Sequence, residues 1–288
     1  MFLQDVEFFS NVGVQSILVG ESLMRAQDPK AKLKELRGDY EPLVKICGLT
    51  DVNEALETVK YGADMIGLIF APQSKRKVSV EAAKQIVAAV KEFRHDTGHV
   101  TELTSESSRD KLIENWFNWL TSAVQSHRPL VVGVFADQPL DEVKFLVQET
   151  GVDIIQLSGG EDWSIIPTLS KPVLRAVHID PTGAPITLDS LPLPSCPVGL
   201  LLDAVDPNSP HMRGGTGQQI AWGSAAPLAR TVPLALAGGL KSSNVAAAVR
   251  TFRPRLVDVA SGVENSPGKK DLEQVRHFIF NAKHAFDT

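Results

Sequence analysis

The chain has 288 residues and a formal net charge of −5, and 43% of its residues are hydrophobic. This length suffices for two average domains or one large α/β barrel, and the hydrophobic share excludes a chain that is disordered throughout. The acidic balance argues against nucleic acid or an anionic membrane as a partner, although it is compatible with a small phosphate pocket.

The N-terminal residues 1–38 do not fit a simple barrel. They begin with MFLQDVEFF, which lacks the basic segment of a secretory signal. No later apolar run approaches the roughly 20 residues that span a bilayer. We therefore expect a soluble, cytoplasmic protein. The stretch GVQSILVGESLMRAQDPKAKLKELRG predicts a strand at SILVG, then a turn and a helix. One such unit cannot close a barrel, so we interpret it as the remnant of a preceding domain.

From residue 43 onward, eight short β-branched runs alternate with longer amphipathic stretches. Most of the runs are continuously apolar, which is typical of strands buried on both faces of a parallel sheet. This alternation matches a (β/α)8 TIM barrel better than an open doubly wound sheet, which would usually need fewer strands. The predicted strands are residues 43–47, 64–70, 130–135, 153–157, 172–179, 199–203, 233–238 and 256–261.

Capping residues mark several helices between these strands. Asp51 and Ser79 are candidate N-caps, Gly62 is a candidate helix stop, and Pro139 suits the first position of a third helix. The fifth connection, residues 181–195, contains too many prolines for a full helix. We expect a loop or a short turn there.

Residues 95–128 are predicted to be an insertion between the second helix and the third strand. The first half, HDTGHVTELTSESS, is polar, and we expect it to be mobile. The second half places Leu112, Trp116, Leu120 and Val124 at helical spacing. This pattern predicts an inserted helix that packs its apolar stripe on the outside of the barrel. A helix that docks a partner is the alternative.

The first predicted strand carries two candidate functional residues. The functional groups of such a barrel gather where its strands end. Cys47 ends the strand, and Lys45 lies on the same face because strand side chains alternate. A nearby ammonium could favour the thiolate that a base requires, although a buried cysteine is usually inert packing. An ion pair between Lys45 and Asp258 of the neighbouring eighth strand is an equally good interpretation of the lysine.

The chain's two cysteines, Cys47 and Cys196, are too few for a cysteine-rich metal site.

Asp203 ends the sixth predicted strand after four apolar residues. Buried acids need partners, so core packing explains this carboxyl group poorly, and we regard it as a candidate general acid. An N-cap is the alternative, but the next predicted helix begins much later. The glycine-rich loop 214–217, which includes Gly215, follows and could close over a ligand or only form turns.

Three further loops follow predicted strands. The loop after the second strand is basic, and Arg76 within it could bind a substrate carboxylate through two hydrogen bonds. Gly238 and Gly239 follow the seventh strand, and Ser261 and Gly262 follow the eighth. Glycines after these two strands often bring backbone N–H groups close to a phosphate. Each loop alone could be an ordinary turn, but together they favour a phosphate monoester pocket.

A family resemblance rests on these segments taken together. KICGLT, GADMIGLIF with SKRKVS, VGVF, LLDA with GGTGQ, LAGGL, and VDVASGVE with PGKKD resemble phosphoribosylanthranilate isomerase of tryptophan biosynthesis. The resemblance implies a barrel, with no metal or organic cofactor, that catalyses an Amadori rearrangement. The substrate would be N-(5-phosphoribosyl)anthranilate and the product 1-(2-carboxyphenylamino)-1-deoxyribulose 5-phosphate. The resemblance also implies roles for Cys47 as general base, Asp203 as general acid and Arg76 as the anthranilate-carboxylate ligand, with substrate or phosphate contacts at Lys45, Gly215, Gly238, Gly239, Ser261 and Gly262.

The N-terminal stretch ILVGESLMR, followed by a DP pair, resembles the last βα unit of indole-3-glycerol-phosphate synthase. This implies a synthase remnant and linker at 1–38 and an isomerase barrel at 39–288. The fungal fused tryptophan enzyme has this order, with a glutamine amidotransferase and the synthase before the isomerase. Expected partners are therefore a small phosphorylated substrate and those domains of the same protein.

One position departs from the family pattern. Family members usually have QLHG after the fourth strand, whereas this chain has QLSG, with Ser158 in place of the histidine. A catalytically silent barrel, kept as a scaffold within a multifunctional chain, is the main alternative to an isomerase. A related histidine-pathway isomerase is disfavoured, because that family uses an aspartate at the end of strand one, where Cys47 lies.

Overall fold

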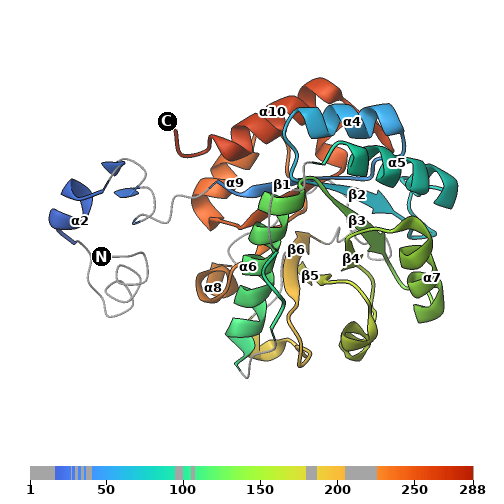
Figure 1. The fold of residues 1–288 in the computed structure, drawn as a ribbon, viewed down its shortest axis with the longest axis horizontal. Helices are drawn as coiled ribbons and strands as arrows, with labels where there is room; N and C mark the ends of the chain where they lie inside the picture. The colour runs from blue at the N-terminus through green and yellow to red at the C-terminus, as the bar shows by residue number, and fades with distance from the viewer. Residues whose placement is uncertain are drawn as a thin grey trace.

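Eight parallel strands form a closed barrel in which each strand pairs with its neighbours in sequence order. A computed structural model of the chain describes residues 17–26, 28–29, 32–33, 36, 41–94, 100–104, 108–179, 187–204 and 226–287. The barrel confirms the predicted TIM-barrel fold (Figure 1). Its strands are β1 (Leu43–Cys47), β2 (Met65–Ile69), β3 (Leu130–Phe135), β4 (Ile154–Leu157), β5 (Val173–Ile179), β6 (Gly199–Ala204), β7 (Ala235–Leu236) and β8 (Leu256–Val259).

The strands lie where the apolar runs predicted them, but β7 and β8 end earlier than expected. Gly238 and Gly239 have φ angles of 81° and 65°, which a regular strand does not contain. Both glycines therefore lie in the loop after β7. Ser261 likewise follows β8 and begins a short 3₁₀ helix (Ser261–Val263). The loops after these two strands, rather than the strands themselves, carry the predicted phosphate contacts.

Helices cover the barrel from outside, and their starts follow local capping chemistry. The Asp51 side chain accepts hydrogen bonds from the backbone N–H groups of Asn53 and Glu54, and Ser79 accepts one from Ala82. Pro139 occupies the N-cap position rather than the predicted first helical position, because the helix begins one residue later. The outer helices are α4 (Val52–Lys60), α5 (Val80–Glu92), α7 (Leu140–Thr150), α8 (Ala226–Thr231), α9 (Val245–Phe252) and α10 (Leu272–Lys283).

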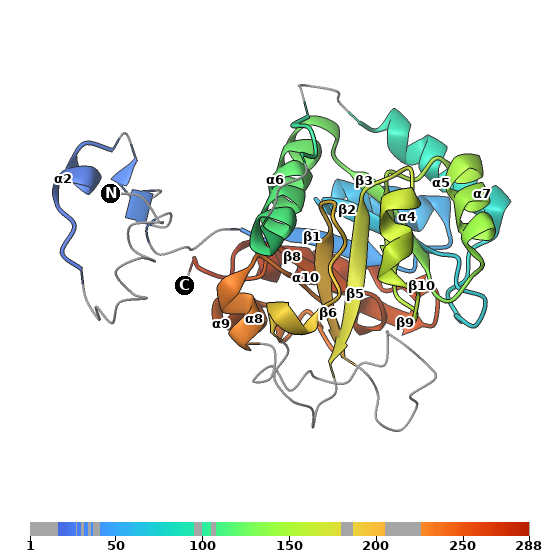
Figure 2. The ribbon, with the colours of Figure 1, turned by 90° about the horizontal axis from the view of Figure 1, so that it is seen from below.

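Two connections in the middle of the chain are short 3₁₀ helices instead of α-helices. The first, η1 (Trp163–Thr168), follows β4 and contains Pro167. The second, η2 (Leu188–Ser190), follows β5. It confirms the predicted short turn for the part of residues 181–195 that the structure describes. Both views show α4, α5 and α7 together on one flank of the barrel (Figures 1 and 2).

The inserted helix α6 (Arg109–His127) packs against β3 and β6. Its predicted stripe is buried, and Trp116 is fully buried. A Cβ atom on Gly199, the first residue of β6, would lie 2.5 Å from the Trp116 ring. At its C-terminal end, α6 is separated from β3 by Arg128 and Pro129. The helix therefore lies on the outside of the barrel, as the apolar spacing predicted, and its Trp116 packs at the N-terminal end of β6.

The segment before α6 was expected to be mobile. Within its described part, residues 100–104, the Thr101 backbone N–H donates to Ser122 Oγ of α6. The Asn115 side chain of α6 donates to the Thr104 carbonyl oxygen. These bonds hold this part against the helix, while residues 95–99 and 105–107 lie outside the described residues.

The N-terminal segment differs from its prediction. Residues 17–20 form no strand, and a four-residue helix, α2 (Glu21–Met24), follows them. A lone strand has no neighbour to complete its hydrogen bonds, so a strand is not expected to persist without partners. Leu18 is 99% exposed and Met24 is 85% exposed. Figures 1 and 2 both show α2 apart from the barrel.

Candidate functional site

Strand register places Cys47 and Asp203 on the inner face of the barrel, near its C-terminal end. Leu201 of β6 pairs with Ala235 of β7, which pairs with Leu256 of β8. Two residues further along, Asp203 and Asp258 therefore share one face. Asp258 pairs with Lys45 of β1, and Cys47 lies two residues beyond that lysine. The thiol and the Asp203 carboxyl group thus face the same interior from the same end of the strands.

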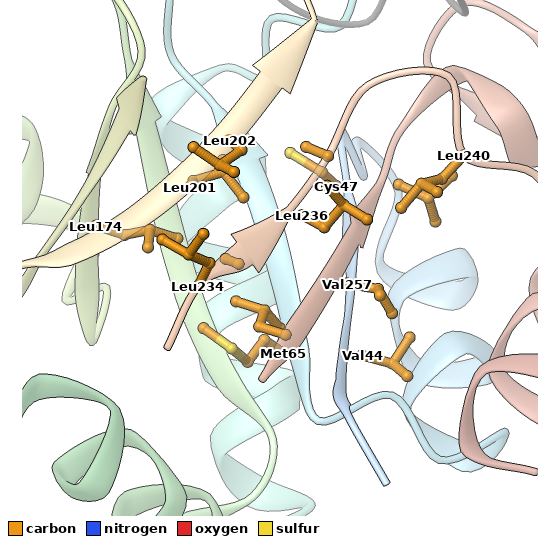
Figure 3. Packing of buried hydrophobic residues seen from close by; sticks show 14 of the residues in the cluster. Val44, Cys47, Met65, Leu174, Leu201, Leu202, Leu234, Leu236, Leu240 and Val257 are labelled. Atoms are coloured by element: carbon orange, nitrogen blue, oxygen red, sulfur yellow. The ribbon is translucent and has the colours of Figure 1, made fainter. Parts of the chain in front are cut away.

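Figure 3 shows the buried hydrophobic residues around Cys47 from close by. Cys47 lies beside Leu236 of β7 in this view, whereas Met65 and Val44 lie lower along the strands. The thiol therefore lies nearer the C-terminal ends of the strands than these two side chains.

Lys45 forms the predicted ion pair with Asp258. Its Nζ atom lies 2.8 Å from Asp258 Oδ2, and the lysine side chain is completely buried. Burial opposes the charge of Lys45, but Asp258 and Cys47 together outweigh burial and raise the pKa of the lysine. The other carboxylate oxygen of Asp258 has no hydrogen-bond partner within the described part of the chain.

Cys47 is buried, and its register partner on β2 has no side chain. It pairs with Gly67 of β2, where a Cβ atom would lie 2.6 Å from the Cys47 sulfur. Burial raises the pKa of the Cys47 thiol, although Lys45 and Lys270 oppose this shift. The ammonium of Lys45 thus favours the thiolate, in the direction expected, but the cost of desolvating the thiolate is larger and the net pKa of the thiol is raised.

Asp203 has a polar neighbourhood that the sequence did not predict. It pairs in register with His178 of β5. His178 Nε2 lies 2.8 Å from the carbonyl oxygen of Ser158, and the Ser158 hydroxyl accepts a hydrogen bond from Gln156. Ser158, the residue that departs from the family pattern, therefore joins a polar group that includes a histidine from the next strand.

Arg76 is held by a carboxylate of the chain itself. Its Nε and Nη2 atoms donate to both carboxylate oxygens of Glu264 at 2.8 to 3.0 Å. Lys270 Nζ contacts the same carboxylate at 2.8 Å. The flanking Lys75 and Lys77 are exposed, so Arg76 is the one member of the basic run that enters a structured site.

The loops after β7 and β8 interlock. A Cβ atom on Gly262 would lie 1.9 Å from the carbonyl oxygen of Leu240, so only glycine fits there. The Asn244 side chain donates to the carbonyl oxygen of Gly239 and fixes the first loop. The structure therefore brings together the predicted phosphate contacts at Gly238, Gly239, Ser261 and Gly262. Gly215 lies outside the described residues.

Sequence reasoning missed Glu264 and Lys270. They lie on two short antiparallel strands, β9 (Glu264–Ser266) and β10 (Lys269–Lys270), that follow the barrel. Both residues belong to segments of the family pattern, GVE and PGKKD, but nothing local predicts that either side chain folds back on Arg76. In the structure, burial distinguishes Lys270 from the adjacent Lys269, which is exposed.

Among the described residues, no helix is both long and apolar enough to span a membrane. In the same residues, no three His, Cys, Asp or Glu side chains are grouped so that they could hold a metal ion.

Comparisons with known proteins agree with this geometry. A model of the family described as N-(5'phosphoribosyl)anthranilate (PRA) isomerase matches residues 87–281. A multifunctional tryptophan biosynthesis protein of Phycomyces blakesleeanus is 38% identical over 97% of this chain and 39% of its own length. An N-(5'-phosphoribosyl)anthranilate isomerase of Dehalococcoides mccartyi is 32% identical over 84% of this chain and 95% of its own length. The crystal structure of phosphoribosyl anthranilate isomerase from Thermotoga maritima has a TM-score of 0.63 and 29% identity, and covers 84% of this chain and 98% of that chain.

The curated relatives fall into two groups by length, long multifunctional or tryptophan biosynthesis proteins and short isomerases. The chain spans 35% to 55% of the length of four longer curated relatives, which match 96% to 97% of it. The shorter isomerases match 83% to 84% of it and are almost completely covered. Similarity to named isomerases favours an active isomerase over a silent scaffold.

Proposed function

The chain belongs to the N-(5'-phosphoribosyl)anthranilate isomerase family, and we propose that it catalyses this family's Amadori rearrangement with Cys47 as base and Asp203 as acid. One observation carries the assignment of these two residues. A thiol and a carboxyl group face one barrel interior from the same end of the strands. One acid and one base are what this isomerisation requires.

The reaction begins with ring opening. Asp203 gives a proton to the ring oxygen of the phosphoribosyl group, the C1′–O bond breaks, and the nitrogen lone pair forms a protonated imine. The imine acidifies the hydrogen on C2′, and the Cys47 thiolate removes that proton. The resulting enol-amine becomes the ketone as the C2′ hydroxyl loses its proton to the Asp203 carboxylate and C1′ gains one from the Cys47 thiol, which restores both groups. No atom is gained or lost, and each proton transfer by a positioned side chain contributes about 10²–10⁴-fold.

The neighbouring groups prepare the thiol for this role. Because burial raises the pKa of Cys47, only a minority of molecules carry the thiolate near neutral pH. Lys45 lies on the same inner face and is held by Asp258. We assign Lys45 the task of stabilising the Cys47 thiolate from two residues earlier on the same face of β1.

The two ends of the substrate are anionic and need different contacts. Backbone N–H groups at Gly238, Gly239, Ser261 and Gly262 suit the phosphate, because the glycines remove side chains that would block its approach. Arg76 suits the anthranilate carboxylate, since a guanidinium can bind a carboxylate through two parallel hydrogen bonds. This proposal covers a small phosphorylated substrate and no nucleic acid.

The domain organisation is a separate proposal. We place a synthase remnant and linker at 1–38 and the isomerase barrel at 39–288, within a longer cytoplasmic protein that also carries synthase and amidotransferase domains. Longer relatives match more of this chain than single-domain isomerases do. Leu18 and Met24 are apolar and exposed, which suits residues that normally pack within another domain.

A fluorescence assay tests the proposed activity. Purified protein is mixed with N-(5-phosphoribosyl)anthranilate, and consumption of the fluorescent substrate is followed over time. Turnover supports the isomerase. Correctly folded protein without turnover would overturn the proposal in favour of the silent scaffold.

A further inference from the structure

We propose that Lys270 is a positioning residue of this isomerase, which acts through Glu264 to aim Arg76 and keeps the carboxylate-binding site positively charged. The inference rests on the proposed function, because it assumes that Arg76 binds the substrate carboxylate. It goes beyond that function by giving a role to a buried ion network that the reaction scheme does not use.

The geometry of the network is specific. Glu264 and Lys270 are buried side chains, 4% and 0% exposed. Lys270 Nζ donates to Glu264 Oε1 at 2.8 Å and to the carbonyl oxygen of Ala260 at 3.0 Å. Ala260 directly follows β8, so the lysine ties the short hairpin to the end of the barrel. Glu264 in turn holds Arg76, whose Cδ atom packs against Gly48, the residue after Cys47.

The hydrogen bonds leave one edge of the Arg76 guanidinium available. Glu264 takes the edge formed by Nε and Nη2. No hydrogen bond from Nη1 occurs within the part of the chain that the structure describes. A guanidinium presents five donors in a planar fork, so it can bind one carboxylate along its side and a second at its end. Glu264 therefore orients Arg76 without using all of its donors.

Charge explains why Lys270 is needed. Arg76 and Glu264 alone are a neutral pair, and a neutral pair attracts a substrate carboxylate weakly. Lys270 adds one positive charge to the pair and restores a net charge of +1. Buried charges are costly unless they are paired and hydrogen-bonded, and here each charged group contacts one of opposite sign.

Lys270 also acts on the thiol. The charged groups that act most strongly on Cys47 are Lys45 on its own strand, Asp258 on β8 and Lys270 on the hairpin, and Asp203 faces the same interior from β6. Lys270 opposes the rise in the pKa of Cys47 that burial causes. Removing its charge should move the formation of the thiolate to higher pH. A lysine with a purely structural role would not produce this change.

The test compares Lys270→Met with Lys269→Met, the adjacent exposed lysine of the same hairpin. We expect Lys270→Met to raise the KM for the substrate about tenfold or more, the size of a lost charge-assisted contact. We expect it also to shift the pH profile of Cys47 alkylation by iodoacetamide to higher pH. Lys269→Met should match the wild-type protein in both measurements.

Two further variants keep the inference falsifiable. Lys270→Arg should restore much of the KM, and Glu264→Gln should raise the KM even if Lys270→Met folds poorly. A KM and an alkylation profile unchanged in Lys270→Met and Glu264→Gln would overturn the inference. Because alkylation does not depend on turnover, inactivity of the wild-type protein would count against the proposed function, whereas an unshifted alkylation profile would count against Lys270.

Discussion

The carboxylates buried at the two ends of the barrel differ in how completely they are hydrogen-bonded. At the N-terminal end, Asp64 accepts a hydrogen bond from the Val44 backbone N–H and contacts both Lys283 and Arg128. At the C-terminal end, Asp258 Oδ1 and Gln156 Oε1 are buried without a hydrogen-bond partner among the described residues. Buried polar atoms are usually satisfied, so an unsatisfied carboxylate oxygen beside the reactive groups calls for an explanation such as a catalytic role.

Apolar packing differs between the two ends as well. The N-terminal end is covered by α6, whose Trp116 and Phe117 lie within the hydrophobic core. The C-terminal end carries glycine loops, a buried thiol and two ion networks instead. The comparison indicates that stability is concentrated at one end and chemistry at the other, as in barrels of this class. Substitutions at the two ends should therefore change different measurements.

The largest expected effect is at the chemical end. Cys47→Ser and Asp203→Asn should each lower kcat by about 10²–10⁴-fold, because each removes one proton-transferring group. Thermal unfolding should change little, since both replacements are close in size. Cys196→Ser is the matched control, because this half-buried cysteine lies away from the interior. Near-normal turnover by either variant would contradict its assigned role.

The next effect belongs to the opposite end. Trp116→Ala should lower the free energy of unfolding by about 3–5 kcal/mol, because it empties a fully buried site against Gly199. The KM of the folded fraction should stay near the wild-type value. Denaturant unfolding and steady-state kinetics measure the two quantities, with Phe145→Ala, 59% exposed, as control. A rise in KM comparable to the loss in stability would show that the two ends are not separable.

A third substitution tests whether the chemical end tolerates any added volume. Gly262→Ala should raise the KM and lower the free energy of unfolding by about 1–3 kcal/mol, because its Cβ atom collides with the Leu240 carbonyl oxygen. Inhibition by inorganic phosphate should weaken in parallel. Gly20→Ala, where an added Cβ atom would meet nothing within 4 Å, should change neither quantity.

The smallest effect is a pH dependence of the wild-type protein. The base must be deprotonated, and burial raises the pKa of the Cys47 thiol. As pH rises from about 6 toward that pKa, kcat/KM should increase by up to about tenfold per unit, in proportion to the thiolate fraction. Parallel rates of iodoacetamide alkylation would link the increase to Cys47. A kcat/KM that is flat over this range would mean that another group is the base.

Much of the fold and part of the site were predictable because their determinants are local. Apolar runs marked the strands, and Asp51 and Ser79 marked helix starts through hydrogen bonds within a few residues. Alternation along β1 correctly placed Lys45 with Cys47. The family resemblance then supplied roles that no spacing could supply.

The remaining features depend on contacts between distant segments. Glu264 lies 188 residues from Arg76, and no local pattern predicts that ion pair. The direction of the Cys47 pKa shift depends on the balance of burial against charges from three elements. The prediction of a strand at SILVG was wrong because a strand needs a neighbouring strand for its backbone hydrogen bonds, and a local sequence pattern does not show whether one is present.

Gly67 shows how a residue without a side chain can decide whether this site works. Even the methyl group of alanine there would sit on the Cys47 sulfur, so β2 reserves the space that the thiol occupies. A related barrel could keep the thiol, the acid and every phosphate loop and still be inactive through one added carbon at this position. To judge whether a related sequence is active, the residue at the position of Gly67 must therefore be checked together with the residues at the positions of Cys47 and Asp203.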